Sequence, residues 1–276
     1  MKKKIRVGIV QGRLSNKINN LIQAFPKKNW EKEFGLAKKI GFEGIEFIFD
    51  NLNNPLLFTN GINKIRNIKS QTNLEIFSIS CDYSMFNPLF GKTKKKTTQV
   101  ALKLLEACNK LSIPRLALSL EDNSSLLNKS DVKDAISCLR IITKKAKKYG
   151  LIVTLETSLS VINIKNLLKK VGSKNLKINF DLGNSCSLGE DTSKAILELN
   201  SLIHSIHIKD RNILFGTTVP LGKGDVNFVK CFKSLKMINF KGDIVIQGAR
   251  GKNHLKTAKN YLKFVKKLIK GSNLSD

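Results

Sequence analysis

The chain has 276 residues, of which 41% are hydrophobic and 25% are charged, as in an ordinary soluble globular protein. No apolar run approaches the roughly 20 residues that a membrane span needs, which argues against a membrane protein. The five cysteines are widely spaced and form no CxxC pair, so they indicate neither a disulfide framework nor a zinc ribbon. The apolar run Val7–Val10 is too short for the core of a signal peptide. We therefore expect a cytoplasmic protein with reduced thiols and no membrane partner.

The formal net charge is +28, and lysines outnumber arginines 42 to 7. A charge of this size can indicate a nucleic-acid or membrane-surface partner. The lysines, however, recur in nearly every predicted helix, and few aromatic residues are interleaved with them, unlike a surface that stacks single-stranded bases. We interpret the charge as lysine-rich helix surfaces and expect no nucleic-acid partner. The same charge should attract anionic small molecules at low salt.

Apolar, β-branched segments alternate with amphipathic, lysine-rich segments along the whole chain. The apolar segments predict strands at Ile5–Val10, Gly44–Phe49, Glu75–Cys81, Arg115–Leu120, Leu151–Leu155, Leu176–Phe180, Ile203–Ile208 and Asp243–Ile246. The amphipathic segments predict helices near residues 30–40, 60–71, 95–111, 131–148, 161–171, 191–200, 226–238 and 253–270.

Residues that favour helix ends support several of these bounds. Gly41, Gly150 and Gly172 fall just after predicted helices, where a left-handed cap is common. Asp131 is a predicted N-cap, as is Thr192 or its neighbour Ser193.

Eight strand–helix units without a linker predict a single (β/α)8 TIM-barrel domain covering residues 1–276. A doubly wound sheet is the alternative, but it would need fewer strands or a second domain. Functional groups of TIM barrels concentrate at the C-terminal ends of the strands. Polar residues lie at or near each such end in this chain, namely Gln11, Glu46, Asp82, Glu121, Glu156, Asp181, His207 and Gln247.

The last four of these residues, Glu156, Asp181, His207 and Gln247, predict the ligands of one divalent cation. Oxygen ligands with one imidazole suit Mn²⁺, Mg²⁺, Co²⁺ or Zn²⁺, and the sequence does not choose among them. Each residue alone has an ordinary structural interpretation, such as a packed histidine or a turn aspartate. Four such residues at the ends of four successive strands favour a metal site.

Several motifs together resemble those of a known superfamily: GIVQGRL, WEKEFGLAKKIGFEGIE, LETS, NFDLGNS, HIKD and VPLGKGDVNF. The chain resembles the xylose isomerase-like TIM-barrel superfamily of sugar phosphate isomerases and epimerases, and most of all the branch found in surface-polysaccharide gene neighbourhoods. In related ketose epimerases, Glu, Asp, His and Glu hold the metal, and the two glutamates move protons on opposite faces of the substrate. The resemblance implies these roles for Glu156, Asp181 and His207, but Gln247 replaces the second glutamate. Asn184 stands where the family has a histidine that contacts substrate.

The expected chemistry is proton transfer next to a carbonyl that a cation polarises, through an enediolate. Glu156 is the predicted catalytic base. Gln247 can bind a metal through its amide oxygen but cannot carry a proton at neutral pH, which favours an aldose–ketose isomerase over a two-glutamate epimerase. Lys209 is the predicted second catalytic residue, because a desolvated lysine can exchange a proton. Other candidates for the second proton carrier are Asp210, Asp82 and Glu46.

Three of the few arginines, Arg13, Arg211 and Arg250, follow strands one, seven and eight, and could bind a phosphate. The loop GTTVPLGKGDV could bring backbone N–H groups to the same anion, namely those of Gly216, Thr217, Thr218, Gly222 and Gly224. The alternative is that Arg211 and Arg250 make structural salt bridges at the rim of the barrel. The predicted substrate contacts are Arg13, Glu46, Asp82, Asn184, Arg211 and Arg250.

The sequence thus predicts an isomerase or epimerase of a sugar or sugar phosphate that uses one divalent metal ion. The alternatives are a dehydratase or a non-catalytic sugar- or polyol-binding barrel of the same superfamily. An abasic-site endonuclease is disfavoured, because three histidines cannot fill its histidine-rich multi-metal site. The sequence leaves homo-oligomerisation open.

Overall fold

A computed structural model describes residues 5–18, 21, 23–213 and 216–274 of the chain. Eight strands carry the fold, and their bounds agree with the predicted ones to within two residues. They are β1 Arg6–Val10, β2 Gly44–Ile48, β3 Glu75–Cys81, β4 Arg115–Leu120, β5 Ile152–Thr157, β6 Leu176–Asp181, β7 Ile203–Ile208 and β10 Asp243–Ile246.

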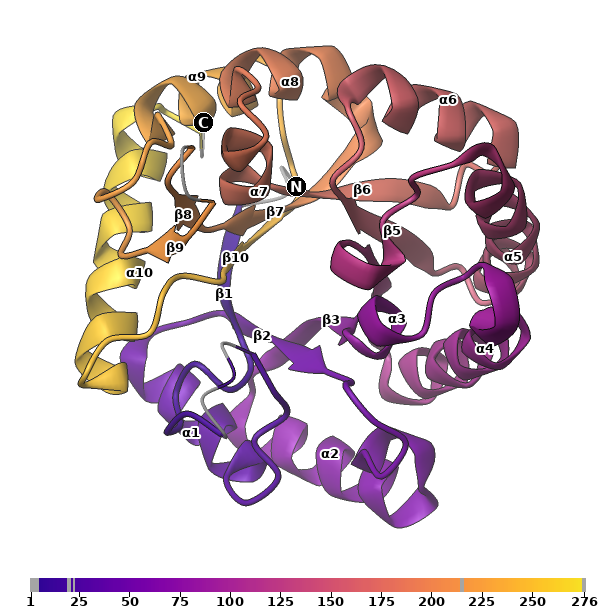
Figure 1. The fold of residues 1–276 in the computed structure, drawn as a ribbon. Helices are drawn as coiled ribbons and strands as arrows, with labels where there is room; N and C mark the ends of the chain where they lie inside the picture. Colours follow the sequence, from indigo (N-terminus) through magenta and orange to yellow (C-terminus); the bar gives the residue numbers. More distant parts are fainter. Residues whose placement is uncertain (1–4, 19–20, 22, 214–215, 275–276) are drawn as a thin grey trace. The chain divides into compact units, whose positions relative to one another are not determined.

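Each predicted helix is present among the described residues (Figure 1). These are α1 Trp30–Ile40, α2 Thr59–Thr72, α4 Lys94–Leu111, α5 Lys129–Lys148, α6 Val161–Val171, α8 Thr192–Leu199, α9 Phe228–Met237 and α10 His254–Gly271. Short helical turns that the sequence did not predict are α3 Tyr83–Phe86, α7 Leu182–Ser187, η1 Pro55–Leu57, η2 Gly91–Thr93, η3 Asp122–Ser124 and η4 Asn200–Leu202. They are too short to show a helical period.

The strand order is that of a closed barrel, β1-β10-β7-β6-β5-β4-β3-β2. Neighbouring strands pair in parallel, for example β4 with β5 and β7 with β10. The predicted (β/α)8 barrel is therefore confirmed. No described helix is both long and apolar enough to cross a membrane.

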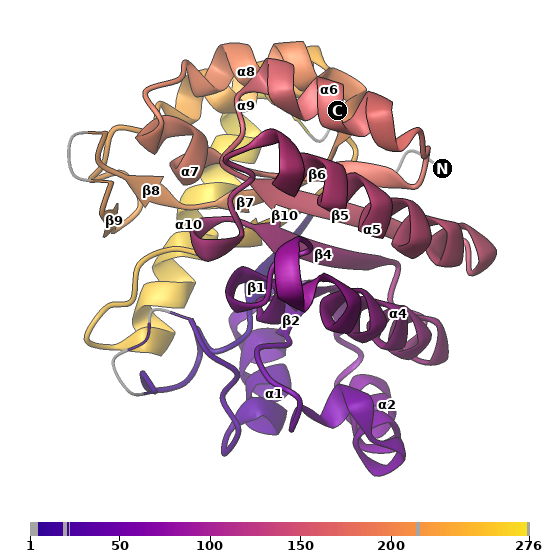
Figure 2. The same ribbon diagram turned by 45° about the vertical axis from the view of Figure 1, so that its right-hand side comes forward.

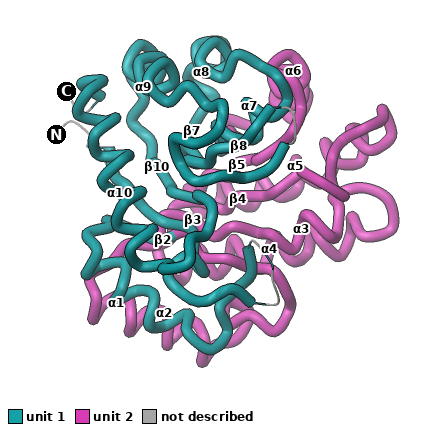
Figure 3. Tube along the Cα trace, turned by 60° about the vertical axis from the view of Figure 1, so that its left-hand side comes forward, with its two compact units in different colours: residues 1–45, 179–276 teal, residues 46–178 magenta. Residues whose placement is uncertain are grey.

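The chain divides into two compact units, residues 1–45 with 179–276 and residues 46–178 (Figure 3). In the first unit, β10 lies between β1 and β7, and Val245 is in register with both Gly8 and His207. Helix α10 packs beside α1 and α9, and α9 beside α8. The prediction that residues 1–276 form one domain stays a prediction.

In the second unit, β4 pairs with β3 and β5, and α4 packs against both α2 and α5 (Figure 2). Strand β3 shows how these strands are buried on both faces. Phe77, Ile79 and Cys81 alternate with Ser78 and Ser80, and all five are buried. Because strand side chains alternate in direction, β3 has one apolar face and one face of small hydroxyls. The second face therefore has room for polar side chains.

The glycines that were predicted to end three helices have the expected left-handed backbone. Gly41 and Gly172 are left-handed C-caps, with φ of 100° and 73°. Gly150, just after α5, also has a positive φ of 67°. A side chain would be strained in this region, so glycine specifies these ends.

Two predicted N-caps are wrong by one to three residues. Asn128 caps α5 by accepting a hydrogen bond from the N–H of Asp131, and Asp191 caps α8 by accepting from Ser193 and Lys194. Both capping residues precede the predicted one and have extended backbone, from which a short side chain reaches the first free N–H groups. Sequence alone does not determine which of several neighbouring cap formers takes this conformation.

Candidate metal-binding and catalytic site

Asp181 ends β6 and begins α7. Its Oδ1 accepts a hydrogen bond from the N–H of Asn184 at 2.8 Å, so the carboxylate is the N-cap of this short helix. The segment NFDLGN therefore turns from strand to helix at the aspartate, as cap chemistry predicts. The side chain of Asp181 is 1% exposed, and its Oδ2 lies 2.8 Å from Nζ of Lys209. This contact is an ion pair.

His207 lies in β7 and is fully buried. Its Nδ1 is 4.0 Å from Oδ2 of Asp181, which is too long for a hydrogen bond. Two ligands that each lie about 2.1 Å from one ion are at most about 4.2 Å apart. The Asp181–His207 pair therefore has a spacing compatible with binding the same cation.

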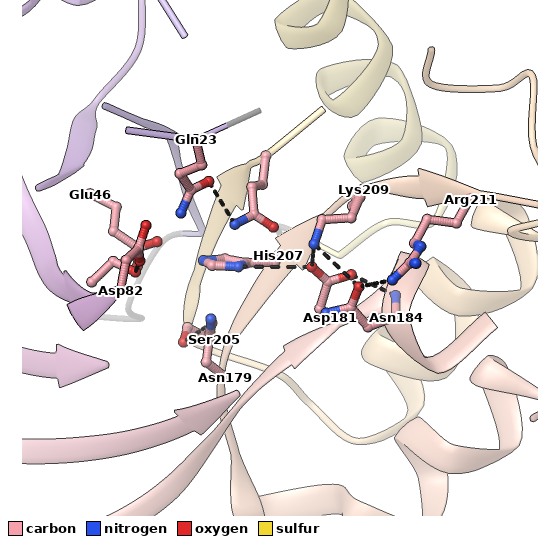
Figure 4. Close-up of polar contacts among 12 residues, drawn as sticks. Gln23, Glu46, Asp82, Asn179, Asp181, Asn184, Ser205, His207, Lys209 and Arg211 are labelled. Carbon is pink, nitrogen blue, oxygen red and sulfur yellow. Dashed lines mark hydrogen bonds and ion pairs between the residues drawn. The ribbon is translucent and has the colours of Figure 1, made fainter. Parts of the chain in front are cut away.

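Asn184 connects the two cationic side chains that follow β7 (Figure 4). Its Oδ1 accepts from Nζ of Lys209 at 3.2 Å and from Nη1 of Arg211 at 2.8 Å. Nε of Arg211 also donates to the carbonyl of Gly216 at 2.6 Å. Gly183 permits this close packing, because a Cβ there would lie 3.0 Å from the Lys209 side chain. In the motif DLGN, the aspartate therefore caps α7, the glycine lets Lys209 approach the backbone, and the asparagine accepts hydrogen bonds from Lys209 and Arg211.

Gln247 follows β10, and its backbone N–H donates to the carbonyl of Ile208 at 2.9 Å. Its side-chain Nε2 donates to Oε1 of Gln23 at 3.0 Å. Its own Oε1 is buried and has no hydrogen-bond partner among the described residues. A buried acceptor without a partner costs about 1–3 kcal/mol, so this oxygen is suited to a ligand.

Arg13 and Arg250 have partners within the protein. Arg13 is buried, and it donates from Nε to the carbonyl of Gly248 at 3.1 Å and from Nη2 to Gln23 at 3.2 Å. Arg250 donates from Nη1 to the carbonyl of Ser15 at 3.0 Å. Burial lowers the pKa of Arg250, and the charge of Glu33 opposes this shift. These contacts are hydrogen bonds to backbone and amide oxygens, and substrate binding by both arginines stays a prediction.

Glu33 anchors the loop after β1. Its Oε2 accepts from the N–H of Gly12 at 2.6 Å and its Oε1 from the N–H of Leu14 at 3.1 Å. Burial raises the pKa of Glu33, and hydrogen bonds from Ser15, Gly12 and Leu14 limit the shift. Sequence reasoning missed this residue, although it shares the buried face of α1 with Trp30, Phe34 and Ala37 at helical spacing.

The predicted anion-binding role of the glycine loop is wrong for Gly222 and Gly224. Their N–H groups donate to Oδ2 of Asp210, at 2.8 and 2.9 Å. Lys223 donates to the same oxygen, and Val226 donates to Oδ1. A short antiparallel pair that the sequence did not predict, β8 Asp210–Arg211 with β9 Thr218–Val219, begins this segment. A buried carboxylate therefore already occupies the place of the expected phosphate.

The predicted site residues of the second unit, Glu46, Asp82 and Glu156, are all buried. Glu156 is the penultimate residue of β5 and is in register with Ser119. Glu46 accepts a hydrogen bond from Oγ of Ser78 at 2.5 Å, and Ser78 in turn accepts from Arg115. This network is fully buried in the interior of its unit.

Asp82 follows β3 and accepts from Oγ of Ser80 at 2.7 Å. It is 5% exposed, against 0% for Glu46. Substrate contacts by Asp82 and Glu46 stay predictions, and the burial of Glu46 makes it the less suited of the two.

Glu156, Asp181 and His207 make up a buried group of described side chains that could each offer one ligand atom to a metal ion. These are three of the four predicted ligands. Two carboxylates and one imidazole fit Mn²⁺, Mg²⁺, Co²⁺ or Zn²⁺. The amide oxygen of Gln247 has the chemistry of a fourth ligand, and its role as a ligand stays a prediction.

The sequence profile of the xylose isomerase-like TIM barrel family matches residues 34–268. The chain belongs to this family. A putative L-ribulose-5-phosphate 3-epimerase of Haemophilus influenzae is 25% identical over 86% of this chain and 90% of its own length. A probable L-ribulose-5-phosphate 3-epimerase of Mycoplasma pneumoniae is 24% identical over 75% of this chain and 72% of its own length.

An uncharacterised protein of Methanocaldococcus jannaschii is 26% identical over 48% of this chain, and the match spans half of that relative's length. Among solved structures, an L-ribulose 3-epimerase superposes with a TM-score of 0.79 at 16% identity, over 98% of this chain and 96% of the other. The 3-keto-D-glucoside 4-epimerase of E. coli superposes with a TM-score of 0.76 at 16% identity, over 96% of this chain and 100% of the other. At such identity these structures show the shared xylose isomerase-like fold.

Proposed function

We propose that this xylose isomerase-like protein is a divalent-metal-dependent isomerase or epimerase of a sugar or sugar phosphate. The buried group Glu156, Asp181 and His207 carries the proposal, because it joins two carboxylates and an imidazole in a family whose relatives here are named as sugar epimerases. Gln247 would complete the ligand set through its Oε1. The bound cation would polarise the carbonyl of the substrate.

Glu156 is the proposed base that removes a proton next to this carbonyl. It sits at the end of β5 with its side chain buried, which keeps competing water away from the carboxylate. Gln247 cannot return the proton on the other face, because an amide does not titrate at neutral pH.

Lys209 is the proposed second proton carrier. Its ammonium group is held between Asp181 and Asn184, and its side chain is 13% exposed. This position is defined by two partners and shielded from most solvent, unlike that of the many surface lysines. If Lys209 donates to the face opposite Glu156, the reaction is an epimerisation. If Glu156 alone moves the proton, it is an isomerisation.

Arg211 is the proposed contact for the anionic group of a sugar phosphate. The side chain of Arg211 is half-buried. It donates hydrogen bonds to one amide oxygen, that of Asn184, and to one backbone carbonyl, that of Gly216. No carboxylate of the described residues forms an ion pair with Arg211, so a phosphate could bind to its charge. A cytoplasmic location stays an expectation from the sequence, and homo-oligomerisation stays open.

Solvent exchange tests the proposal. The protein is incubated with Mn²⁺ in D₂O and a panel of ketopentoses and ketohexoses with and without a terminal phosphate. Deuterium at C-3 indicates a 3-epimerase, and deuterium at C-1 or C-2 indicates an aldose–ketose isomerase. Glu156→Gln should slow the exchange at least about 100-fold, the usual share of a general base.

Arg211→Ala supplies the substrate test within the same assay. It should raise KM for phosphorylated sugars much more than for neutral sugars, with Arg140→Ala on the exposed face of α5 as the control. Binding of sugars without exchange at any carbon would contradict catalysis and indicate a sugar-binding protein. Equal changes in KM for both kinds of sugar would contradict the role of Arg211.

A further inference from the structure

The orientation of the Gln247 side chain is set by two residues from the loop after β1. Gln23 accepts two hydrogen bonds on the same oxygen, Oε1: one from Nη2 of Arg13 at 3.2 Å and one from Nε2 of Gln247 at 3.0 Å. A guanidinium group has donors only, so the group of Gln23 that faces Arg13 must be its oxygen. Gln247 must then present its NH₂ group to that oxygen. The chain Arg13–Gln23–Gln247 therefore fixes which end of the Gln247 amide faces away.

The end that faces away is the carbonyl oxygen. Oε1 of Gln247 is buried and has no hydrogen-bond partner in the part of the chain that the structure describes, and Gln247 is only 6% exposed. A flipped amide would place its NH₂ group there instead and would set two oxygens against each other at Gln23. An NH₂ group cannot bind a cation, whereas the amide oxygen can.

We propose that Gln23 is a positioning residue that holds the Gln247 amide with its oxygen toward the metal. The proposal rests on the proposed function, because it assumes that the cation lies where Gln247 Oε1 can reach it. Arg13, in this arrangement, acts through Gln23 and not on the substrate. It is itself held by the carbonyl of Gly248, one residue after Gln247.

The arrangement also predicts how a carboxylate at position 247 would behave. Gln247→Glu brings an oxygen against Oε1 of Gln23. Gln23 must then flip and lose its bond to Arg13, or the new carboxylate must turn away. A charged ligand at position 247 would by itself strengthen cation binding. Loss of the Arg13–Gln23 hydrogen bond opposes this gain in affinity.

Mn²⁺ affinity tests the proposal without any assay of activity. It is measured by competition with a fluorescent chelator on the full-length protein. Gln23→Leu removes the acceptor and should weaken Mn²⁺ binding about tenfold, the lower end of the effect of residues that orient metal ligands. Gln23→Glu keeps an oxygen for both donors and should retain the affinity. Gln71→Leu, at an exposed position of α2, is the matched control.

A second measurement keeps the test decisive if Gln23→Leu disturbs the loop. In a Gln247→Leu background, Gln23→Leu should have no further effect on Mn²⁺ affinity, because the ligand that it positions is gone. Additive losses, or a Gln23→Leu protein that binds Mn²⁺ as well as wild type, would overturn the proposal. His207→Ala and Asp181→Asn distinguish failure of the proposed metal site from failure of the positioning role of Gln23. If these two variants bind Mn²⁺ as tightly as wild type, the proposed metal site is wrong, and the positioning role falls with it. If they abolish Mn²⁺ binding while the Gln23 variants do nothing, the metal site stands and the positioning role falls.

Discussion

The ion pair between Lys209 and Asp181 makes a specific link between stability and metal binding. The two side chains are 13% and 1% exposed, and Nζ and Oδ2 are 2.8 Å apart. Lys209→Met removes the positive charge and leaves the buried carboxylate with the N–H of Asn184 on its other oxygen. Without metal, we expect this variant to be less stable than wild type.

The size of the effect follows from the burial of the pair. Removing one partner of a buried ion pair costs about 3–5 kcal/mol, and the partial exposure of Lys209 places this pair near the lower end. At about 3 kcal/mol and 2–4 °C per kcal/mol, the variant should melt roughly 6–12 °C lower than wild type without metal. Saturating Mn²⁺ replaces the missing positive charge at Asp181, so the rise in Tm on adding Mn²⁺ should be larger for Lys209→Met than for wild type.

Differential scanning fluorimetry with and without Mn²⁺ measures both quantities, and Lys233→Met, on the exposed face of α9, is the control. Two results would refute the reasoning. A metal-free Tm equal to that of wild type would mean that the ion pair does not stabilise the fold. Equal Mn²⁺ shifts in variant and wild type would mean that Asp181 does not bind the ion.

Two further predictions concern the loops around the site. Asp210→Ala removes the acceptor of four backbone N–H groups, and should lower the free energy of unfolding by about 2–4 kcal/mol, since charge-assisted bonds are lost but water can reach part of the loop. Exchange of the backbone amide hydrogens should then speed up at residues 216–226. Unchanged protection there would contradict the view that the Asp210 carboxylate holds this loop. Because burial raises the pKa of Glu33 above its ordinary value of 4.5, the neutral form stabilises the fold at acid pH, and this contribution is lost as pH rises through the folded-state pKa. In urea titrations, wild type should therefore lose unfolding free energy relative to Glu33→Gln as pH rises above 4.5, and a pH-independent difference would exclude the effect.

The strands, the helices and the glycine C-caps could be predicted because their signals are local. Alternation of apolar runs with amphipathic segments predicts strand and helix positions, and a glycine after a helix predicts its left-handed end. The short elements α7, β8 and β9 gave no such signal, since two to six residues cannot show a period. The polar residues at strand ends were visible for the same local reason, and three of them form the buried group that could bind a metal.

The partners of those polar groups could be decided only by the tertiary structure. Gly222 and Gly224 look like anion ligands in sequence, but Asp210 already accepts their N–H groups. Gln23 has no signal in its loop, yet it contacts Gln247 from 224 residues away in the chain. A sequence thus determines which groups each strand end offers. Folding decides which of them remain available, because most buried donors and acceptors are paired, often with neighbours that are distant in sequence.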